Sequence, residues 1–173
     1  KNAGLVRGRI EKMDSGQDFL CIIDYAHTPD AIERLILTAR TLLKDKARPG
    51  RVITLFGCGG DRDRGKRPVM GEIATRLSDY VIITSDNPRS EDPGEIIKDI
   101  VSGITRDNYI AVTDRKKAII MAVEQAEKGD ILLIAGKGHE DYQEIRGIRH
   151  SFSDRKVAEK AIQNKLRGDK VER

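Results

Sequence analysis

The sequence has no tryptophan, few aromatic residues and only 2 cysteines, and each scarcity argues against a class of protein. Aromatic residues make up 4% of the chain, so it has few rings on which nucleic-acid bases could stack. No apolar run approaches the ~20 residues of a membrane-spanning helix, and the first residues lack the apolar core of a signal peptide. Cys21 and Cys58 each lie in an apolar, strand-like run, which predicts buried, reduced thiols in a cytosolic protein.

The composition is typical of one globular domain, with 38% hydrophobic and 35% charged residues among 173. A chain of this length buries roughly 70% of the surface that it exposes when unfolded, enough for one core without metals or disulfides. The 32 Lys and Arg exceed the 28 Asp and Glu by a net charge of +4. Charges of both signs alternate along most of the chain, so nucleic-acid binding is not expected. The excess of positive charge is equally consistent with a domain that binds anionic small molecules, such as nucleotides or carboxylates.

Short apolar runs alternate with amphipathic helical patterns along the chain. Asp114 and Ser153 are good N-caps for two of the helices, and Gly147 divides a small hairpin. The apolar face expected for the first helix consists of Ile32, Leu35, Ile36, Ala39, Leu42 and Leu43. The expected strands are 19–23, 52–56, 80–84, 109–112, 131–135, 142–145 and 148–152, and the expected helices begin near 29, 68, 93, 115 and 154.

This alternation predicts an α/β, Rossmann-like fold: a mostly parallel sheet with helices on both faces, right-handed crossovers and a C-terminal β-hairpin. Loops that follow parallel strands emerge at the carboxyl edge of the sheet, where open α/β folds bind their ligands. The loops that carry the unusual residues of the chain should therefore converge there. They are 24–29, 57–67, 85–89 and 136–140.

The loop 57–67 is rich in glycine and in alternating Arg and Asp. Gly60 to Lys66 satisfies GxxxxGK, the opening of a phosphate-binding loop, but Arg67 stands where the Ser or Thr that holds Mg²⁺ belongs. The dinucleotide pattern GxGxxG fails at Arg62. A glycine-rich turn with solvated charges is the ordinary interpretation. The density of opposite charges favours, instead, ion pairs that present a guanidinium to a carboxylate.

Two further loops carry groups that suit a zwitterion. Asp86 offers a carboxylate to an ammonium and Arg89 a guanidinium to a carboxylate, although an Asn-Pro turn alone would explain the segment. Glu140 follows two glycines that let the backbone pass close to a ligand, with a tight turn as the alternative. His27 precedes a helix N-terminus, where anions bind, or is a surface histidine. The 3 histidines and 2 cysteines show no metal spacing, and neither a GxSxG motif nor a Cys–His pair indicates covalent catalysis.

Taken together, the loops closely resemble the C-terminal domain of MurE-type Mur ligases, the UDP-N-acetylmuramoyl-tripeptide synthetases. The resemblance extends from about Gly4 to Lys165. It rests on motifs in the same order along the chain: Gly8-Arg9-Ile10-Glu11, Asp24-Tyr25-Ala26-His27-Thr28-Pro29, Gly57-Cys58-Gly59-Gly60-Asp61-Arg62-Asp63, Gly65-Lys66-Arg67-Pro68, Asp86-Asn87-Pro88-Arg89 and Gly136-Lys137-Gly138-His139-Glu140.

The resemblance implies an ATP-dependent amide ligase of peptidoglycan synthesis. ATP would phosphorylate the D-glutamate carboxylate of UDP-N-acetylmuramoyl-L-alanyl-D-glutamate, and the amine of the incoming amino acid would attack the acyl phosphate. The chain, which opens on Lys1 rather than Met, would be a single domain, 1–173, that binds this amino acid and closes over ATP. A linker at about 1–10 would join it to N-terminal and central domains that hold ATP and Mg²⁺, and a frayed tail would cover 167–173. Without those domains we expect no ligase activity.

The resemblance also assigns residues. The segment 86–89 is similar to that of enzymes that add meso-diaminopimelate rather than L-lysine, and diaminopimelate has a second carboxylate that lysine lacks. A folylpolyglutamate-type or other Mur-type ligase should lack this segment, whereas a nucleotide-binding module using 60–66 would bind ATP with Mg²⁺ by itself. No catalytic residue or metal ligand is assigned. The resemblance implies that Arg62, Asp86, Asn87, Pro88, Arg89, Gly136 and Glu140 bind diaminopimelate and that Arg9, Asp24, Tyr25 and His27 face ATP.

Overall fold

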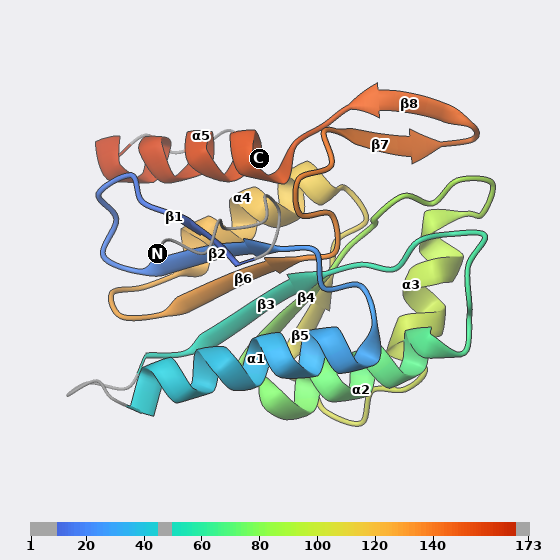
Figure 1. Ribbon diagram of the computed structural model, residues 1–173, viewed down its shortest axis with the longest axis horizontal. Coiled ribbons are helices and arrows are strands. Elements are labelled where there is room, and N and C mark those ends of the chain that lie inside the picture. Colours follow the sequence, from blue (N-terminus) through green and yellow to red (C-terminus); the bar gives the residue numbers. More distant parts are fainter. Residues whose placement is uncertain (1–9, 45–49, 169–173) are drawn as a thin grey trace, which may run out of the picture.

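The structure is a computed structural model that describes residues 10–44 and 50–168 (Figure 1). Arg9, the rest of the predicted linker up to residue 9, and residues 169–173 of the predicted tail lie outside these residues. Arg167 and Gly168, which were included in the predicted frayed tail, are instead the last residue and the C-cap of the final helix. The elements are β1 (Glu11–Met13), β2 (Leu20–Asp24), α1 (Pro29–Lys44), β3 (Val52–Phe56), α2 (Lys66–Leu77), β4 (Tyr80–Ile83), α3 (Pro93–Val101), β5 (Tyr109–Ala111), α4 (Arg115–Gln125), β6 (Ile131–Ala135), β7 (Tyr142–Ile145), β8 (Ile148–Ser151) and α5 (Asp154–Arg167).

Among the described residues, six strands form one sheet in the order β1-β2-β6-β3-β4-β5, and β7 pairs with β8 in a separate antiparallel hairpin. All neighbours in the six-stranded sheet are parallel except β1 and β2. β6 lies in the middle, with Leu133 opposite Ile22 of β2 on one side and Thr54 of β3 on the other. The carboxyl ends of β2, β3, β4 and β6 therefore meet at one edge.

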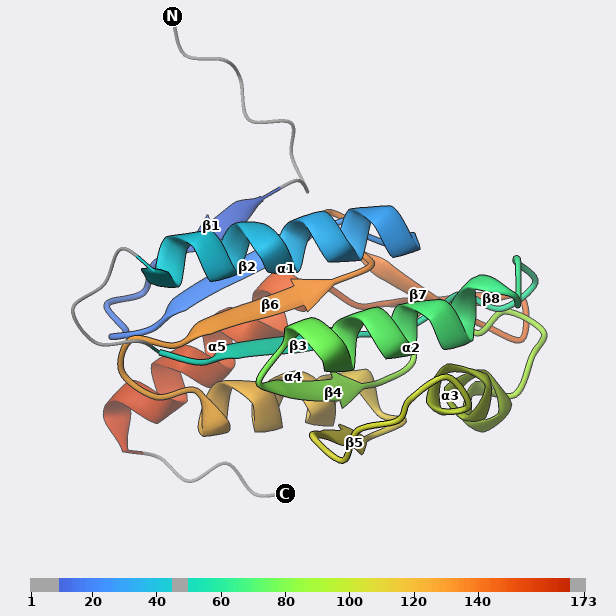
Figure 2. The same cartoon turned by 90° about the horizontal axis from the view of Figure 1, so that it is seen from below.

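Helices cover both faces of this sheet, as Figures 1 and 2 show. α1, α2 and α3 pack on one face, where Phe56 and Ile83 belong to their core cluster. α4 and α5 pack on the other face, around Leu55 and Ile82. Every residue of β3 and β6 is buried, which is typical of strands covered on both sides. The predicted Rossmann-like α/β fold with a C-terminal hairpin is confirmed.

Local signals explain where the elements begin. The side chains of Asp114 and Ser153 accept hydrogen bonds from the amides of Lys117 and Lys156, which confirms both as N-caps. Cys21 and Cys58 are buried and free, as predicted. Burial raises the pKa of each thiol to about 12, so that both stay protonated at neutral pH.

Two details of the sequence interpretation are wrong. The sequence predicts Leu42 on the buried face of α1, but Leu42 is 39% exposed, because it lies just outside the edge of the buried stripe formed by Ile32, Leu35, Ile36, Ala39 and Leu43. The antiparallel strand β1 was not expected at all. It has 3 residues, of which Glu11 and Lys12 are polar, and so it shows no periodicity. β1 is defined by its hydrogen bonds to β2, which form only in the folded sheet.

Candidate functional site

The predicted loops meet at the carboxyl edge of the sheet, around a cavity of about 390 Å³. All four loops contribute to its lining, as their positions after parallel strands predict. Pro88 is buried beside it, and Asp24 lines a neighbouring cavity of about 370 Å³. The predicted residues that line the larger cavity are Arg62, Asp86, Asn87, Arg89, Gly136 and Glu140, together with Tyr25 and His27.

Glycines allow these loops to approach one another closely. A Cβ atom at Gly60 would lie 1.9 Å from the carbonyl oxygen of Pro88, and the amide of Gly60 donates to the carbonyl of Asn87 at 2.9 Å. Gly136 has a φ of +115°, and a Cβ there would lie 2.7 Å from Oδ2 of Asp86. Both contacts require a residue without a side chain. The backbones of three loops are thereby brought within reach of one ligand.

Arg89 lies at the centre of the site in a strained conformation, with a φ of +52°. Its backbone is held by the hairpin: its amide donates to the carbonyl of Glu144 at 3.0 Å, and its carbonyl accepts from the amide of Arg146 at 2.6 Å. Its Nη1 donates to the carbonyl of Gly60 at 2.8 Å, and its Nε lies 3.8 Å from a carboxylate oxygen of Glu144. The side chain is 21% exposed and lines the cavity. Left-handed residues of this kind cluster at functional sites, where surrounding bonds offset their strain.

Asp61 is strained in the same way, with a φ of +53°. Its carboxylate accepts from the hydroxyl of Ser90 at 2.6 Å and from the amide of Ser90 at 3.2 Å. These hydrogen bonds lower the pKa of Asp61. They connect the glycine-rich loop to the residue that directly follows Arg89. The predicted anion-binding guanidinium of Arg62 is exposed beside this contact and donates to the carbonyl of Asp61.

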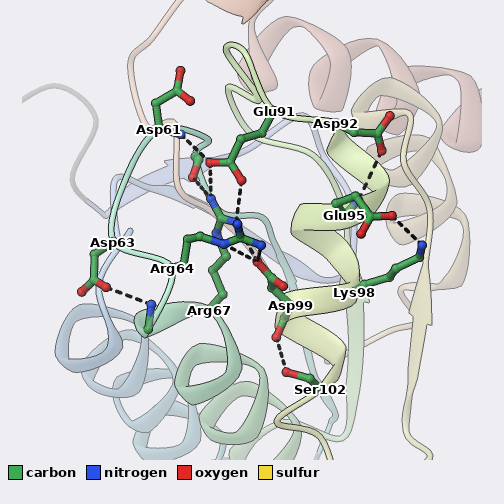
Figure 3. A network of polar contacts seen from close by, with 12 residues as sticks. Asp61, Asp63, Arg64, Arg67, Glu91, Asp92, Glu95, Lys98, Asp99 and Ser102 are labelled. Carbon is green, nitrogen blue, oxygen red and sulfur yellow. Dashed lines mark hydrogen bonds and ion pairs between the residues drawn. The ribbon is translucent and has the colours of Figure 1, made fainter.

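Arg67 connects the same two loops from below (Figure 3). Its fully buried guanidinium binds both carboxylate oxygens of Glu91, at 2.7 and 2.9 Å, and one of Asp99 at 2.8 Å. Arg64 binds Asp99 as well, at 3.0 Å. The hydrogen bonds from Arg67 lower the pKa of Glu91 to about 2. The pair therefore contributes its full stability at pH values above the ordinary pKa of a glutamate, and this contribution is lost as the pH falls towards 2. The ion pairs predicted for this loop exist, but their carboxylates come from outside it.

The structure also argues against a phosphate-binding loop at Gly60 to Lys66, which Arg67 already disfavours in the sequence. In such a loop the backbone amides must be free to bind phosphate. Here the amides of Gly60, Asp61 and Gly65 donate to other groups of the chain, and the ammonium of Lys66 donates to the carbonyl of His27 at 2.8 Å. Residues 60–66 therefore hold the loops of the site together through these hydrogen bonds.

Asn87 and Glu140 are held together by a residue that the sequence interpretation missed. The buried ammonium of Lys137 donates to Oδ1 of Asn87 at 2.9 Å and to Oε2 of Glu140 at 3.0 Å. Nδ2 of Asn87 donates to the same Oε2 at 2.9 Å. The only signal for Lys137 in the sequence is its place between two glycines after the most apolar strand.

A buried ion pair supports the ends of β4 and β6. Arg115 and Asp154 are both fully buried, and two guanidinium nitrogens bind the two carboxylate oxygens at 2.7 and 2.8 Å. Arg115 also donates to the carbonyls of Ser85 and Ala135, at 3.1 and 3.0 Å. Those residues immediately precede Asp86 and Gly136. The pair thus fixes where two loops of the site begin.

The residues predicted to face ATP lie at one end of the site. The carboxylate of Asp24 accepts from the amides of Ile10 and Ala26, both at 2.7 Å, and so fixes the turn after β2. The rings of Tyr25 and His27 are in edge contact, with centroids 4.6 Å apart. Burial and the negative charges of Glu140 and Asp86 raise the pKa of Tyr25, so its phenol remains a hydrogen-bond donor at neutral pH.

Comparison with known proteins identifies the family. Residues 8–138 match the family model described as Mur ligase, glutamate ligase domain. The chain belongs to the Mur ligase family. The Mur ligase domain is 50% identical over 165 residues to a UDP-N-acetylmuramoyl-L-alanyl-D-glutamate–2,6-diaminopimelate ligase of Syntrophomonas wolfei subsp. wolfei. The aligned region covers 94% of this chain and 33% of that protein. It is 51% identical over 158 residues to the ligase of the same name from Aquifex aeolicus, covering 91% of this chain and 32% of that protein.

A solved structure of a UDP-N-acetylmuramoyl-L-alanyl-D-glutamate–2,6-diaminopimelate ligase has the same fold. It matches the Mur ligase domain with a TM-score of 0.83 and 44% identity, over 93% of this chain and 32% of that chain. The predicted resemblance to MurE-type ligases is confirmed. The chain spans about a third of the length of the curated relatives that it matches.

Within its described residues, the Mur ligase domain has no group of three or more His, Cys, Asp or Glu placed to hold a metal ion. None of the helices described in residues 10–44 and 50–168 is long and apolar enough to cross a membrane.

Proposed function

We propose that this domain binds meso-diaminopimelate and presents its amine to an acyl phosphate of UDP-N-acetylmuramoyl-L-alanyl-D-glutamate. The observation that carries the proposal is the gathering of Asp86, Asn87 and Arg89 with Arg62 and Glu140 around one cavity. Such a site offers guanidinium groups to a carboxylate and carboxylates to an ammonium. The relatives named above, which are diaminopimelate ligases, support the same substrate.

In this reaction ATP transfers its terminal phosphoryl group to the D-glutamate carboxylate and leaves as ADP. The amine of diaminopimelate then forms the new C–N bond while the C–O bond to phosphate breaks, and inorganic phosphate and one proton are released. A carboxylate is a poor electrophile until phosphate supplies the leaving group. The domain contributes by holding the amine in line with the acyl carbon and by excluding water.

The proposed roles divide the site. Arg62 and Arg89 bind the distal carboxylate of the amino acid, and Asp86, Asn87 and Glu140 orient its ammonium and carboxylate from the other side. Pro88 stiffens the turn, and Gly136 leaves room for the ligand. Asp24, Tyr25 and His27 border the nucleotide when the domain closes over ATP, and Arg9 would do so from the segment before β1.

The described residues do not fit a site for Mg²⁺ and the phosphates of ATP. They include no group of three or more His, Cys, Asp or Glu placed to hold a metal ion, and the amides of Gly60, Asp61 and Gly65 in the glycine-rich loop are already bound within the chain. We therefore assign ATP and Mg²⁺ to N-terminal and central domains of a longer chain, to which residues 1–173 contribute a single amino-acid-binding domain.

Substrate selectivity tests the proposal. The full-length ligase containing this domain should add meso-diaminopimelate to the UDP-N-acetylmuramoyl dipeptide, with a kcat/KM at least ~10-fold to ~100-fold above that for L-lysine. Lysine has no distal carboxylate with which the guanidinium of Arg89 could pair. Phosphate release measured with each amino acid gives the ratio. Equal rates with both amino acids, or a preference for lysine, would contradict the proposed substrate.

The isolated domain should have neither ligase nor ATPase activity, because phosphorylation of a carboxylate needs a phosphate cradle and a metal site. The measurement is Mg²⁺-dependent ADP release by the purified 173-residue chain. Full-length enzyme in the same assay, with the dipeptide and diaminopimelate, is the positive control. ATP hydrolysis by the isolated chain would show that it holds a phosphate site of its own.

A further inference from the structure

Lys137 is a charged residue that the proposed chemistry does not yet use. Its side chain has no exposed surface, and its ammonium lies between the amide of Asn87 and the carboxylate of Glu140. The ring of Tyr142 lies on a further side, with its centroid 5.5 Å from the nitrogen. A buried ammonium is tolerated only when it is paired and hydrogen-bonded. Lys137 is therefore anchored by two residues proposed to bind the amino acid.

The ammonium determines which way the amide of Asn87 faces. Oδ1 accepts from Lys137 at 2.9 Å and from the backbone amide of Glu144 at 3.0 Å. Nδ2 donates to Glu140 at 2.9 Å and retains a second hydrogen. An ammonium only donates hydrogen bonds, so rotating the amide would bring two donors together. The remaining N–H of Asn87 is thus kept for a ligand.

Lys137 also orients the carboxylate of Glu140. Oε2 accepts both bonds described above, from Lys137 and from Asn87. Among the hydrogen bonds of the described residues, none reaches Oε1. The side chain of Glu140 is 18% exposed and lines the cavity. The carboxylate therefore has one oxygen held by the protein and one for an ammonium of the ligand.

We propose that Lys137 is the positioning residue of the amino-acid site: it holds Asn87 and Glu140 so that one presents a donor and the other an acceptor to diaminopimelate. This inference rests on the proposed function. Lys137 does not touch the substrate and acts through these two side chains.

The test replaces Lys137 with methionine, which is similar in length and has no charge, in the full-length ligase. The KM for diaminopimelate should rise ~10-fold or more, because both side chains lose their orientation, while the KM for ATP should change less than ~2-fold. A purely structural defect would not separate the two KM values. Lys98→Met is the matched control, since Lys98 also pairs with a glutamate three residues away, at 2.5 Å, but is 74% exposed. It should leave both constants unchanged.

Loss of Lys137 leaves Glu140 without its partner, so folding is checked by thermal unfolding. If Lys137→Met does not fold, Lys137→Met with Glu140→Gln removes both charges and is compared with Glu140→Gln alone. A KM for diaminopimelate several-fold above that of Glu140→Gln supports the role through Asn87. A KM equal to that of Glu140→Gln overturns the proposal, as does an unchanged KM in a folded Lys137→Met enzyme.

Arg89→Ala separates this inference from the proposed function. Arg89 makes no contact with Lys137 among the hydrogen bonds and ion pairs of the described residues. If Arg89→Ala leaves the KM for diaminopimelate unchanged, the proposed function is wrong, whatever Lys137→Met does. If Arg89→Ala raises it and Lys137→Met does not, only the role of Lys137 is wrong.

Discussion

Replacing Arg89 with alanine in the full-length ligase should raise the KM for meso-diaminopimelate by ~10-fold to ~100-fold or more and change the KM for ATP little. A guanidinium and a carboxylate form a planar, charge-assisted pair with two parallel hydrogen bonds. Arg89 is preorganised for it: its Nη1 is fixed on the carbonyl of Gly60 at 2.8 Å, and the side chain is only 21% exposed. The measurement is steady-state kinetics with each substrate varied in turn.

Arg89→Lys should recover only part of the loss. An ammonium has no planar fork, so it cannot bind the carbonyl of Gly60 and both oxygens of a carboxylate with one rigid group. Both variants keep a side chain at a φ of +52°, so they share the backbone strain of the native residue. Arg76→Ala is the matched control, because Arg76 lies on α2 and pairs with Glu72 at 2.8 Å, away from the cavity. Wild-type kinetics for Arg89→Ala would make the segment 86–89 a structural turn and the proposed substrate wrong.

Replacing Arg115 with alanine should cause the largest loss of stability. Arg115 and Asp154 are both fully buried, and breaking such a pair by removing one partner costs ~3–5 kcal/mol, because the other charge remains buried. In a domain of this size that corresponds to a fall in Tm of ~6–20 °C. Arg64→Ala removes an ion pair with Asp99 whose arginine is 65% exposed, and it should cost at most ~1 kcal/mol.

The measurement is thermal unfolding of the wild type, Arg115→Ala and Arg64→Ala, followed by circular dichroism. Arg115→Met with Asp154→Leu removes both charges and should recover much of the loss, since a well-packed apolar pair often replaces a buried ion pair without cost. A Tm of Arg115→Ala within ~2 °C of the wild type would show that the pair contributes no more than a surface one. A double variant no more stable than Arg115→Ala would assign the loss to the bonds that Arg115 makes with Ser85 and Ala135.

Much of the fold is predictable because its signals are local. β3 and β6 are continuous apolar runs, and both were expected with the bounds that the structure has. The caps Asp114 and Ser153 act within a few residues of themselves. The convergence of the loops follows from parallel topology alone. Each of these features is determined by residues that are close to one another in the sequence, or by the order of the strands.

The residues that support the site could not be predicted in the same way. Arg115 and Asp154 are 39 residues apart, and neither disturbs the apolar pattern of its helix. Lys137 meets Asn87 across 50 residues, and Arg67 meets Glu91 across 24. Each pairing depends on how two loops or helices pack in three dimensions. A charged residue in an otherwise ordinary position gives no sign in the sequence that it will be buried.

The position of β6 between β2 and β3 has a consequence for the order of folding. β2 and β3 follow each other in the chain but do not pair, because β6, which begins at Ile131, fills the place between them. During synthesis, β1 and β2 on one side and β3, β4 and β5 on the other can form only separate half-sheets with unpaired edges. Insertion of β6 joins the halves and closes the longest loops between paired strands of the sheet, which makes it a late and slow event. The ligand cavity, whose walls come from both halves, then exists only after most of the domain has left the ribosome.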